Sequence, residues 1–333
     1  MSSVGQGGYL SDGQNREELV TPNPVLDRER PSCQPAMVRM DATVIIVTYN
    51  SAAYITECLA SVRAQKGVQA EIIVVDNHSS DDTVGVVRGL GEGIHLIANA
   101  ENAGFGRGNN LGFAASHGRF IYLLNPDAQL VRSDALAGLC NALDNHPRWG
   151  MAGNLVRSPD GKILGTQPHT TYPGQERART DFSRLPGQVA WVLGASMCFR
   201  REVYAALGGF DPDFFLYAEE TDICLRLRKL GHEIGFLKEV EVQHIGGTTE
   251  QDRDPYDVWT QRMQSLCRFW QKHFLPEDVR RLVRYEQLRS VRRILGYGLQ
   301  ALFRPPHSPA WHNLRQWQAR RKAASRFLAA GLP

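Results

Sequence analysis

The sequence predicts an α/β fold in which a mostly parallel, Rossmann-like sheet is flanked by helices. Apolar β-branched runs alternate with helical spacings of apolar residues through the first half of the chain, and a polar cluster follows each run. Alternation of this kind indicates parallel strands joined by right-handed crossovers. Such sheets bind ligands at the carboxyl ends of their strands, so the residues directly after each strand are the candidate functional residues.

The elements of this half follow in order along the chain. Short apolar runs, typical of strands buried on both faces, occupy residues 43–47, 71–75, 94–97 and 120–124. Apolar residues at helical spacing predict three intervening helices, which run through residues 55–62, 84–90 and 111–115. The second half is mixed, with a strand expected at 192–200. Further helices are expected through residues 136–143, 202–207, 223–230 and 263–270.

Composition and charge exclude several classes. The net charge of +3 does not indicate a nucleic-acid binder. The chain has no run of about 18 apolar residues of the kind that spans a membrane. Its polar N-terminus also lacks the apolar core of a signal peptide. Six cysteines without CxxC spacing favour neither a zinc site nor a redox motif, and they indicate a reducing, cytoplasmic compartment.

Four polar clusters stand directly after the four predicted strands. They are Thr48-Tyr49-Asn50, Asp76–Asp81, the glycine-rich segment Asn102–Asn110, and Asn125-Pro126-Asp127. Each cluster alone is compatible with a plain turn or a helix cap. Their convergence on one sheet edge favours a ligand site, and a nucleoside diphosphate suits it. Asp and Asn can bond to a base or ribose, glycine amides can face phosphate, and a carboxylate can hold Mg²⁺ or Mn²⁺.

Six segments of the sequence occur in an order typical of one enzyme family. They are VIIVTYN, IIVVDNHSSD, NAGFGRGNNLG, LLNPDAQL, VLGASMCFRREVYAALGGFDPDFFLYAEETDICLRLRKLG and EVQHIGG. Over about residues 42–250 the chain resembles the family 2 inverting glycosyltransferases of the GT-A fold. The nearest subgroup is similar to rhamnosyltransferases that extend lipid-linked sugars. The resemblance implies transfer of a sugar to a glycan or a polyprenyl-diphosphate-linked saccharide in cell-surface polysaccharide synthesis. It implies dTDP-rhamnose as donor, and UDP-sugars stay open.

The resemblance also implies roles for residues at the sheet edge. The nucleotide-sugar site is expected to contain Thr48, Tyr49, Asn50, Asp76, Asn77, Asn102, Gly104, Asn110 and Asn125. Asn125-Pro126-Asp127 stands where the family has its DxD metal motif, so Asp127 is the only carboxylate there. His244 resembles the late metal-ligand histidine of the family, although a lone histidine is more often structural. Asp127 and His244 are therefore the expected ligands of Mg²⁺ or Mn²⁺.

Three acidic residues, Glu219, Glu220 and Asp222, open a predicted helix after an aromatic run. The helix macrodipole favours acids in a first turn, so helix initiation alone explains one or two of them. Neighbouring like charges and burial raise a carboxyl pKa toward the value that a general base needs. The stretch resembles the ED motif that supplies the base in the family, with Glu220 where Asp is usual. Glu220 is the expected base, and Asp222 and Glu219 are expected to orient neighbours or the acceptor.

The acceptor region is expected around Trp191 and Gly194, which resemble the place where the family docks its acceptor. A core position is equally compatible with Trp191. The long loop at 165–188 carries arginines that either meet a diphosphate on a lipid-linked acceptor or form solvated surface; they are Arg177, Arg179 and Arg184.

The chain divides into three segments. Residues 1–39, rich in Ser, Gly, Pro and Gln, predict a flexible extension. Residues 40–275 are expected to form the GT-A domain, with a nucleotide-binding half at 40–130 and an acceptor and catalytic half at 131–275. Residues 276–333 hold twelve Arg and Lys against three acidic residues, with apolar residues at helical spacing. This basic helical extension either lies on an anionic membrane, at the inner face of the cell membrane, or packs on the domain with a solvated face.

Two other classes compete with the active enzyme. A dinucleotide-binding oxidoreductase is disfavoured, because the glycine-rich segment follows the third strand and does not complete G-x-G-x-x-G. A catalytically inactive relative acting as a scaffold is supported only by the departures at Asn125 and Glu220. Replacing Glu220 by Gln should abolish transfer by an enzyme and leave a scaffold unaffected.

Overall fold

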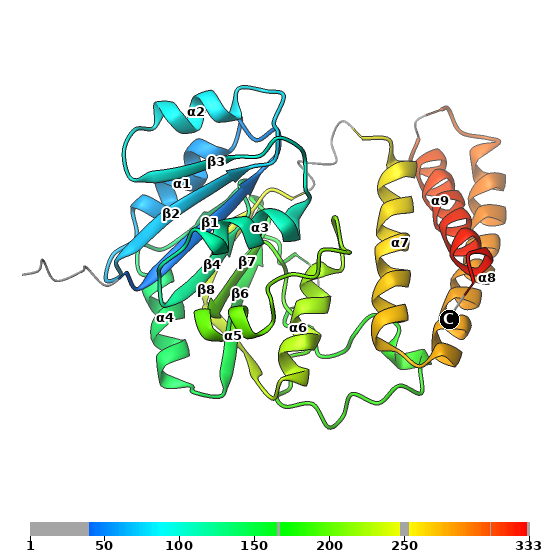
Figure 1. Cartoon of the computed structure of the whole chain (residues 1–333). Helices are drawn as coiled ribbons and strands as arrows, with labels where there is room; N and C mark the ends of the chain where they lie inside the picture. Colours follow the sequence, from blue (N-terminus) through cyan, green and yellow to red (C-terminus); the bar gives the residue numbers. More distant parts are fainter. Residues whose placement is uncertain (1–39, 165–166, 247–252, 307, 332–333) are drawn as a thin grey trace, which may run out of the picture. The chain divides into compact units, whose positions relative to one another are not determined.

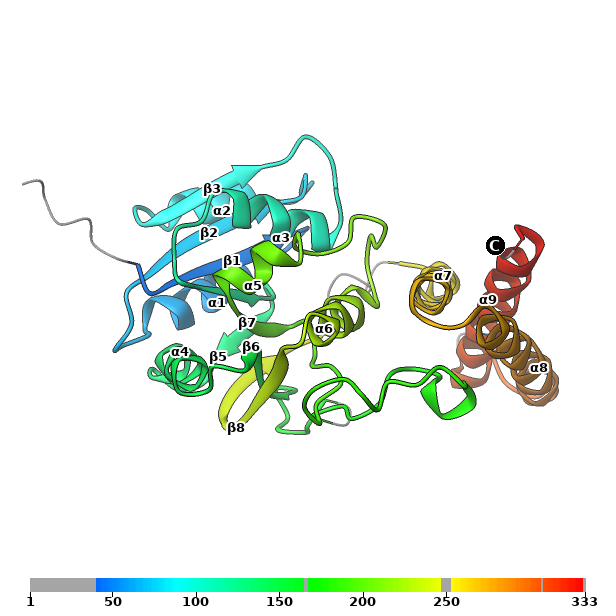
Figure 2. The same ribbon diagram turned by 60° about the horizontal axis from the view of Figure 1, so that its bottom comes forward.

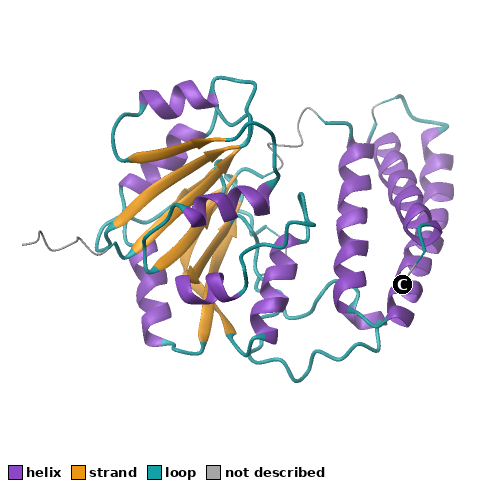
Figure 3. Cartoon of the chain, viewed as in Figure 1, coloured by secondary structure: helices purple, strands orange, loops and turns teal. Residues whose placement is uncertain are grey.

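The computed structural model describes residues 40–164, 167–246, 253–306 and 308–331. The described chain contains an eight-stranded sheet with the order β3-β2-β1-β4-β7-β6-β8-β5 (Figure 1). Helices pack on both faces of this sheet, as the colouring by element shows in Figure 3. The predicted α/β class is confirmed. The extension predicted at the N-terminus lies outside the described residues and stays a prediction.

The first half of the sheet is parallel. Its strands are β1 (Ala42–Thr48), β2 (Ala70–Asp76), β3 (Ile94–Ala98) and β4 (Phe120–Leu124). The helices between them are α1 (Ile55–Arg63), α2 (Thr83–Gly89) and α3 (Phe105–Ala114). β1 pairs in parallel with β2 and β4, and β2 pairs in parallel with β3. All four predicted strands are confirmed, and their carboxyl ends share one edge of the sheet.

The second half of the sheet mixes strand directions. Its strands are β5 (Ala128–Leu130), β6 (Trp149–Arg157), β7 (Ser196–Arg200) and β8 (Glu233–His244). β7 is antiparallel to β4 and β6, β5 is antiparallel to β8, and β6 and β8 are parallel. The strand predicted at 192–200 begins only at Ser196, because Gly194 and Ala195 form a turn. The Asn125 N–H, directly after β4, donates to the Ala195 carbonyl of this turn (3.0 Å).

Two apolar cores fix the shorter helices to the sheet. One face packs against α1, α2 and α4 (Ala135–Asn145), which contributes the buried Leu139. The other face packs against α3, α5 (Arg201–Ala206) and α6 (Glu219–Lys229), which contributes the buried Ile223. The cysteines of the described residues are free and buried, as expected of thiols that act as small apolar side chains.

A third core joins three long helices to one another and to a loop. The helices are α7 (Pro255–His273), α8 (Pro276–Ala301) and α9 (Pro309–Ala329), coloured yellow to red in Figure 2. Their buried residues, including Trp270, pack against the loop between β6 and β7, which carries the 3-10 turn η1 (Gln175–Arg177). α7 therefore packs with the two helices of the predicted extension, and the predicted boundary between them stays a prediction. Within the described residues, no helix combines the length and apolarity needed to cross a bilayer.

Candidate active site

A buried carboxylate marks the edge where β1 and β2 end. Thr48 and Asp76 are register partners at the last positions of these strands. The Thr48 hydroxyl donates to Asp76 Oδ1 (2.9 Å), and the Ser79 N–H donates to Asp76 Oδ2 (2.9 Å). These donors fix the plane of the carboxylate, as required of a group that recognises a base or ribose. Tyr49 follows Thr48 and exposes 39% of its surface beside this edge.

The Asn77 side chain connects this edge to the glycine-rich segment. Its Nδ2 donates to the Gly104 carbonyl (3.0 Å), and its Oδ1 accepts from Asn99 Nδ2 (2.7 Å). The Gly104 N–H donates to Asn102 Oδ1 (3.0 Å). The structure thus brings Asn77, Asn102 and Gly104 together at the strand ends. The sequence analysis does not identify Asn99, although its position directly after β3, where its N–H donates to the Asp76 carbonyl, is a usable signal.

Glycines hold α3 close to its neighbours. Gly104 has φ +86°, and a Cβ there would lie 2.4 Å from the Phe215 carbonyl oxygen, which accepts the Phe105 N–H at 3.1 Å. A Cβ at Gly108 or Gly112 would lie 2.7 or 2.5 Å from side-chain carbons of β1. Because these positions lack a Cβ, α3 can pack closely against β1 with its N-terminus facing the strand ends. The helix begins at Phe105, earlier than the predicted helix.

Asn110 lies on α3, but its amide group bonds to the segment around α5. Its Nδ2 donates to the Phe210 carbonyl (2.8 Å). Its Oδ1 accepts from the Phe210 N–H and from the Tyr204 hydroxyl, each at 2.9 Å. These bonds indicate a positioning role for Asn110. Its direct contact with the nucleotide-sugar stays a prediction.

Backbone strain concentrates in three turns of the candidate site. Among the described residues, the non-glycine residues with positive φ are Asn50 (51°), His78 (62°), Tyr217 (71°) and Ala218 (66°). Asn50 is held in place because its Oδ1 accepts the Ser80 N–H (2.8 Å). Left-handed φ costs about 1–3 kcal/mol at a residue such as Tyr or Ala, and it persists only where the surrounding structure enforces it. The strain therefore marks the turns after β1 and β2 and the turn before the acidic residues of α6.

Asp127 and His244 form a close pair. Ala128 and His244 are register partners of β5 and β8, and His244 Nε2 lies 3.1 Å from Asp127 Oδ1. Asn125 Nδ2 lies 3.2 Å from the same Nε2. The Gly246 N–H donates to Asp127 Oδ2 (3.1 Å). The structure thus brings together the residues of the predicted metal motif and the late histidine.

This donor set fits a divalent cation. Two neighbouring ligands in an octahedral shell of about 2.1 Å radius stand about 3.0 Å apart, which matches the separation of Asp127 and His244. A metal at this position would require the tautomer with a lone pair on His244 Nε2, the nitrogen that faces both the Asp127 oxygen and the Asn125 amide. Across the described residues, no group of three or more His, Cys, Asp and Glu gathers with metal-binding spacing. The described chain therefore offers two ligands, and diphosphate oxygens and water would complete the shell.

The first two acids of α6 differ in exposure. Glu219 is buried, and burial together with the charge of Glu220 raises its pKa well above the usual range. Its Oε2 has no hydrogen-bond partner within the described part of the chain. Burial also raises the pKa of Glu220, whereas backbone N–H groups and the charge of Arg262 lower it. Glu220 stays partly exposed and packs against Gly194, where a Cβ would lie 3.4 Å from Glu220 Cβ.

Both carboxylate oxygens of the third acid, Asp222, have side-chain partners. Its Oδ2 accepts from Arg226 Nε (2.7 Å), and its Oδ1 lies 2.7 Å from Nε2 of His273 at the end of α7. Burial raises the pKa of Asp222, but the hydrogen bond with His273 and the Arg226 charge outweigh it, so the pKa lies below its usual range. Asp222 therefore fixes α6 against α7, and its orienting role in catalysis stays a prediction. No sequence pattern marks His273, because its partner is distant along the chain.

The predicted acceptor residues lie in different settings. Gly194 contacts Glu220 through the turn before β7. Trp191 is partly buried and stacks on His169 with ring centroids 3.6 Å apart, and its Nε1 donates to the Thr171 carbonyl (3.1 Å). Trp191 thus joins the loop before β7 to the core, and its contact with an acceptor stays a prediction.

Comparison with known sequences identifies the family. Residues 43–208 match the family model described as Glycosyl transferase family 2. The N-acetylglucosaminyl-diphospho-decaprenol L-rhamnosyltransferase of Mycobacterium tuberculosis is 28% identical over 234 residues, which is 60% of this chain and 75% of that protein. The O-antigen chain rhamnosyltransferase WbaN of Salmonella anatum is 24% identical over 206 residues, with 61% and 65% covered.

Solved structures share the fold. The mannosyltransferase PcManGT from Pyrobaculum calidifontis, in complex with GDP-Man and Mn²⁺, aligns with a TM-score of 0.53 at 20% identity, covering 88% of this chain and 75% of that chain. S. aureus TarS 1-349 in complex with UDP-GlcNAc aligns with a TM-score of 0.51 at 16% identity, covering 87% and 92%. The GT-A fold and the family predicted from the sequence are confirmed. The chain belongs to glycosyl transferase family 2 and is a glycosyltransferase.

Proposed function

We propose that this glycosyltransferase transfers rhamnose from dTDP-rhamnose, with inversion, to a saccharide hydroxyl in cell-surface polysaccharide synthesis. The acceptor is a glycan or a polyprenyl-diphosphate-linked saccharide. Support for this substrate class comes from the names of the similar proteins, which are rhamnosyltransferases of a decaprenol-linked sugar and of O-antigen chains. UDP-sugars are the alternative donors for the same site.

One observation carries the proposal: a single turn connects the Asp127–His244 pair to Glu220. Asn125 approaches His244 Nε2 at 3.2 Å and donates its N–H to Ala195. Gly194, the preceding residue, packs on Glu220. The groups that would hold a diphosphate and the proposed base therefore stand on either side of one turn, as an attack in line with the leaving group requires.

The donor nucleotide is proposed to lie along the ends of β1, β2 and β3. Asp76 and Asn77 would bond to the base or ribose, with Thr48 and Asn99 fixing their orientation. The exposed ring of Tyr49 is available to stack on the base. A bound Mg²⁺ or Mn²⁺, held by Asp127 and His244, would neutralise charge on the diphosphate.

Glu220 is proposed as the base. Its carboxylate takes the proton of the acceptor hydroxyl as the acceptor oxygen bonds to the anomeric carbon. The bond from that carbon to the diphosphate oxygen breaks at the same time, and the nucleoside diphosphate keeps the electron pair. Attack from the opposite face inverts the configuration. Glu219 is less suited to this role, because its buried carboxyl stays protonated to a higher pH.

The proposed setting is the cytoplasm, at the inner face of the cell membrane. A polyprenyl-linked acceptor is confined to the bilayer, so an enzyme acting on it gains from a peripheral position there. The basic C-terminal helices supply the proposed contact with anionic lipid.

Thermal unfolding with nucleotides tests the proposal first. The full chain is melted with dTDP, UDP, GDP or NAD, each with and without Mn²⁺ or Mg²⁺, because a ligand that binds only folded protein raises the melting temperature. A metal-enhanced shift with dTDP supports the proposed donor, and a shift with UDP alone redirects it to UDP-sugars. No shift with any diphosphate contradicts an active enzyme and favours a scaffold. A shift with NAD alone contradicts the assignment of this edge.

A further inference from the structure

The exposed face of α8 carries large apolar side chains. Leu288, Leu295, Leu299 and Leu302 expose 62–77% of their surface, and the adjoining Phe303 exposes 80%. At 3.6 residues per turn, the four leucines fall within an arc of about 60° around the helix axis. We name these five residues, of which Leu302 and Phe303 directly follow α8, the apolar ridge.

The apolar ridge is not needed for the packing of α8. A different set of residues on this helix is buried against its neighbours, and it includes Val279, Leu282 and Val283. Exposed leucines scattered singly need no explanation, but a row of them along one face marks an interaction surface.

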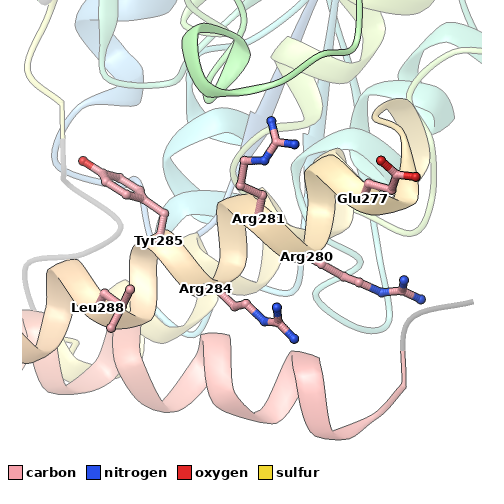
Figure 4. A pocket seen from close by; sticks show the side chains of 6 residues that line it. All are labelled: Glu277, Arg280, Arg281, Arg284, Tyr285 and Leu288. Carbon is pink, nitrogen blue, oxygen red and sulfur yellow. The ribbon is translucent and has the colours of Figure 1, made fainter.

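Arginines extend the same face toward the start of α8. Arg280, Arg281 and Arg284 line a hollow together with Glu277, Tyr285 and Leu288 (Figure 4). Figure 4 shows Arg280 and Arg284 directed to one side of the helix, and Arg281 and Tyr285 directed to the other. The hollow therefore holds three arginines, on both flanks of the helix, against one acidic residue, Glu277, next to the first leucine of the ridge.

Two further arginines adjoin this face. Arg292 is exposed between Leu288 and Leu295 of the ridge. Arg177, from the loop that connects to the proposed acceptor region, lies over the Tyr285 ring at 4.4 Å. Arg281 pairs with Asp278 at 3.4 Å.

Much of the positive charge of this face stays uncompensated. Arg280, Arg284 and Arg292 are exposed and form no ion pair with the described acidic residues. The face thus combines an apolar row with free positive charge.

We propose that the apolar ridge and the arginines of α8 dock this enzyme on an anionic lipid bilayer. The combination matches a surface in which negative headgroups border an apolar interior. A second copy of the chain fits less well, because it would bring the exposed arginines of two copies into one interface. The inference rests on the proposed function in one respect: a lipid-linked acceptor gives this docking its purpose.

Vesicle flotation of the full chain tests the docking. Vesicles of phosphatidylcholine alone are compared with vesicles that also contain phosphatidylglycerol. Each arginine near an anionic surface contributes about a five-fold gain in affinity. Replacing Arg280, Arg284 and Arg292 by Gln should therefore weaken binding to anionic vesicles by about 100-fold and reduce its salt dependence. Replacing three exposed arginines outside the C-terminal helices, Arg88, Arg132 and Arg148, removes the same charge and should have little effect.

The apolar ridge is tested by Leu295→Ser, Leu299→Ser and Leu302→Ser together. These side chains are exposed, so the variant should fold, and flotation on anionic vesicles should be lost. Val131→Ser with Leu230→Ser, both half exposed on other elements, should float as the unchanged chain does. Equal flotation of each variant and its control would overturn the proposal. Dimers in light scattering that the ridge variant alone loses would overturn it in favour of a second copy, and a gel shift with polynucleotide but no flotation would overturn it in favour of nucleic acid.

Transfer to two acceptors separates this inference from the proposed function. The α8 variants should keep transfer to a short-chain, water-soluble acceptor and lose transfer to the same saccharide embedded in vesicles. If the unchanged chain floats on anionic vesicles but transfers to neither acceptor, the proposed substrate fails and the docking stands. If it transfers to both equally and does not float, the docking fails and the substrate stands.

Discussion

Replacing Glu220 or Glu219 with glutamine distinguishes the two neighbouring acids at the start of α6. Glutamine has nearly the shape of glutamate, so Glu220→Gln keeps the contact with Gly194 and removes only the proton acceptor. A general base contributes about 10²–10⁴ in rate, which corresponds to about 2.7–5.4 kcal/mol of barrier. We expect kcat/KM for sugar transfer to fall by that factor. In the unchanged chain kcat/KM should rise with pH through the raised pKa of Glu220, and the variant should lose this rise.

Glu219 supplies the matched control. Burial and the Glu220 charge raise the pKa of Glu219, which makes it less suited to accept a proton, so Glu219→Gln should keep transfer within a few-fold. A raised folded-state pKa contributes stability that is present below the unfolded value of about 4.3 and is lost as pH rises through the folded pKa. Glu219→Gln should therefore flatten the decline of the unfolding free energy over this range, measured by urea denaturation. Loss of the pH-dependent rise in kcat/KM with Glu219→Gln, and its retention with Glu220→Gln, would refute the assignment of the base.

Three further predictions concern the framework of the site. Gly104→Ala places a methyl group 2.4 Å from a backbone oxygen at a residue with φ +86°, so the free energy of unfolding in urea should fall by about 3 kcal/mol. Gly91→Ala is the control. Gly91 has φ +81° but lies in open space, so this variant should lose about 1 kcal/mol. His273→Ala removes a 2.7 Å bond to the buried Asp222 carboxylate and should lower the free energy of unfolding by about 2 kcal/mol near pH 7. Because the pKa of Asp222 is lowered, the difference in stability between variant and unchanged chain should vanish as pH falls through the folded-state pKa of Asp222. A difference that stays constant with pH would contradict the pairing. His244→Ala should weaken Mn²⁺ binding at least about ten-fold. The melting temperature should then rise with dTDP as it does without metal, and the further rise that Mn²⁺ gives in the unchanged chain should be lost. An unchanged further rise with Mn²⁺ would exclude His244 as a ligand.

The parallel half of the fold could be predicted because its strands are uninterrupted apolar runs. A strand buried on both faces needs apolar residues at every position, and the segments that became β1 and β4 meet this condition. β6 (Trp149–Arg157) could not be found in this way, because Gly150, Gly153 and Asn154 interrupt its apolar pattern. At Gly153 the close packing of a distant segment requires glycine, because a Cβ there would lie 2.6 Å from a side-chain carbon of Val192. Neighbours distant along the chain set these positions, so the local pattern does not reveal them.

The residues of the candidate site could be predicted where the sheet topology alone determines their location. Parallel strands bring their carboxyl ends to one edge, so Asp76, Asn77 and Asp127 could be grouped from the strand pattern alone. The same reasoning could not decide whether Asn110 contacts the ligand or a neighbouring segment of the protein. Its position after a strand does not reveal which face of the helix its side chain occupies. Nor could it find His273, which reaches Asp222 from a helix 51 positions further along the chain.

The C-terminal helices contact the segment that carries the proposed base, beginning at the turn before α6. Tyr217 and Ala218 hold strained backbone conformations next to Glu219 and Glu220, and strain of this kind relaxes unless packing opposes it. The Arg262 guanidinium of α7 lies over the Tyr217 ring at 4.7 Å, and His273 of the same helix holds Asp222. α7 is in turn buried against α9, where the Arg320 guanidinium reaches the ring of an α7 tryptophan at 5.5 Å.

The packing therefore runs from the apolar cores of α8 and α9 through α7 to the turn that positions the proposed base. We infer that α8 and α9 have a structural role besides the proposed membrane contact. Without α8 and α9, the apolar side of α7 would lose its cover, and the contacts of Arg262 and His273 with the turn would lose their support. A helical unit that both faces lipid and holds the catalytic turn would place the base at a fixed height above the bilayer, where a lipid-linked hydroxyl can reach it.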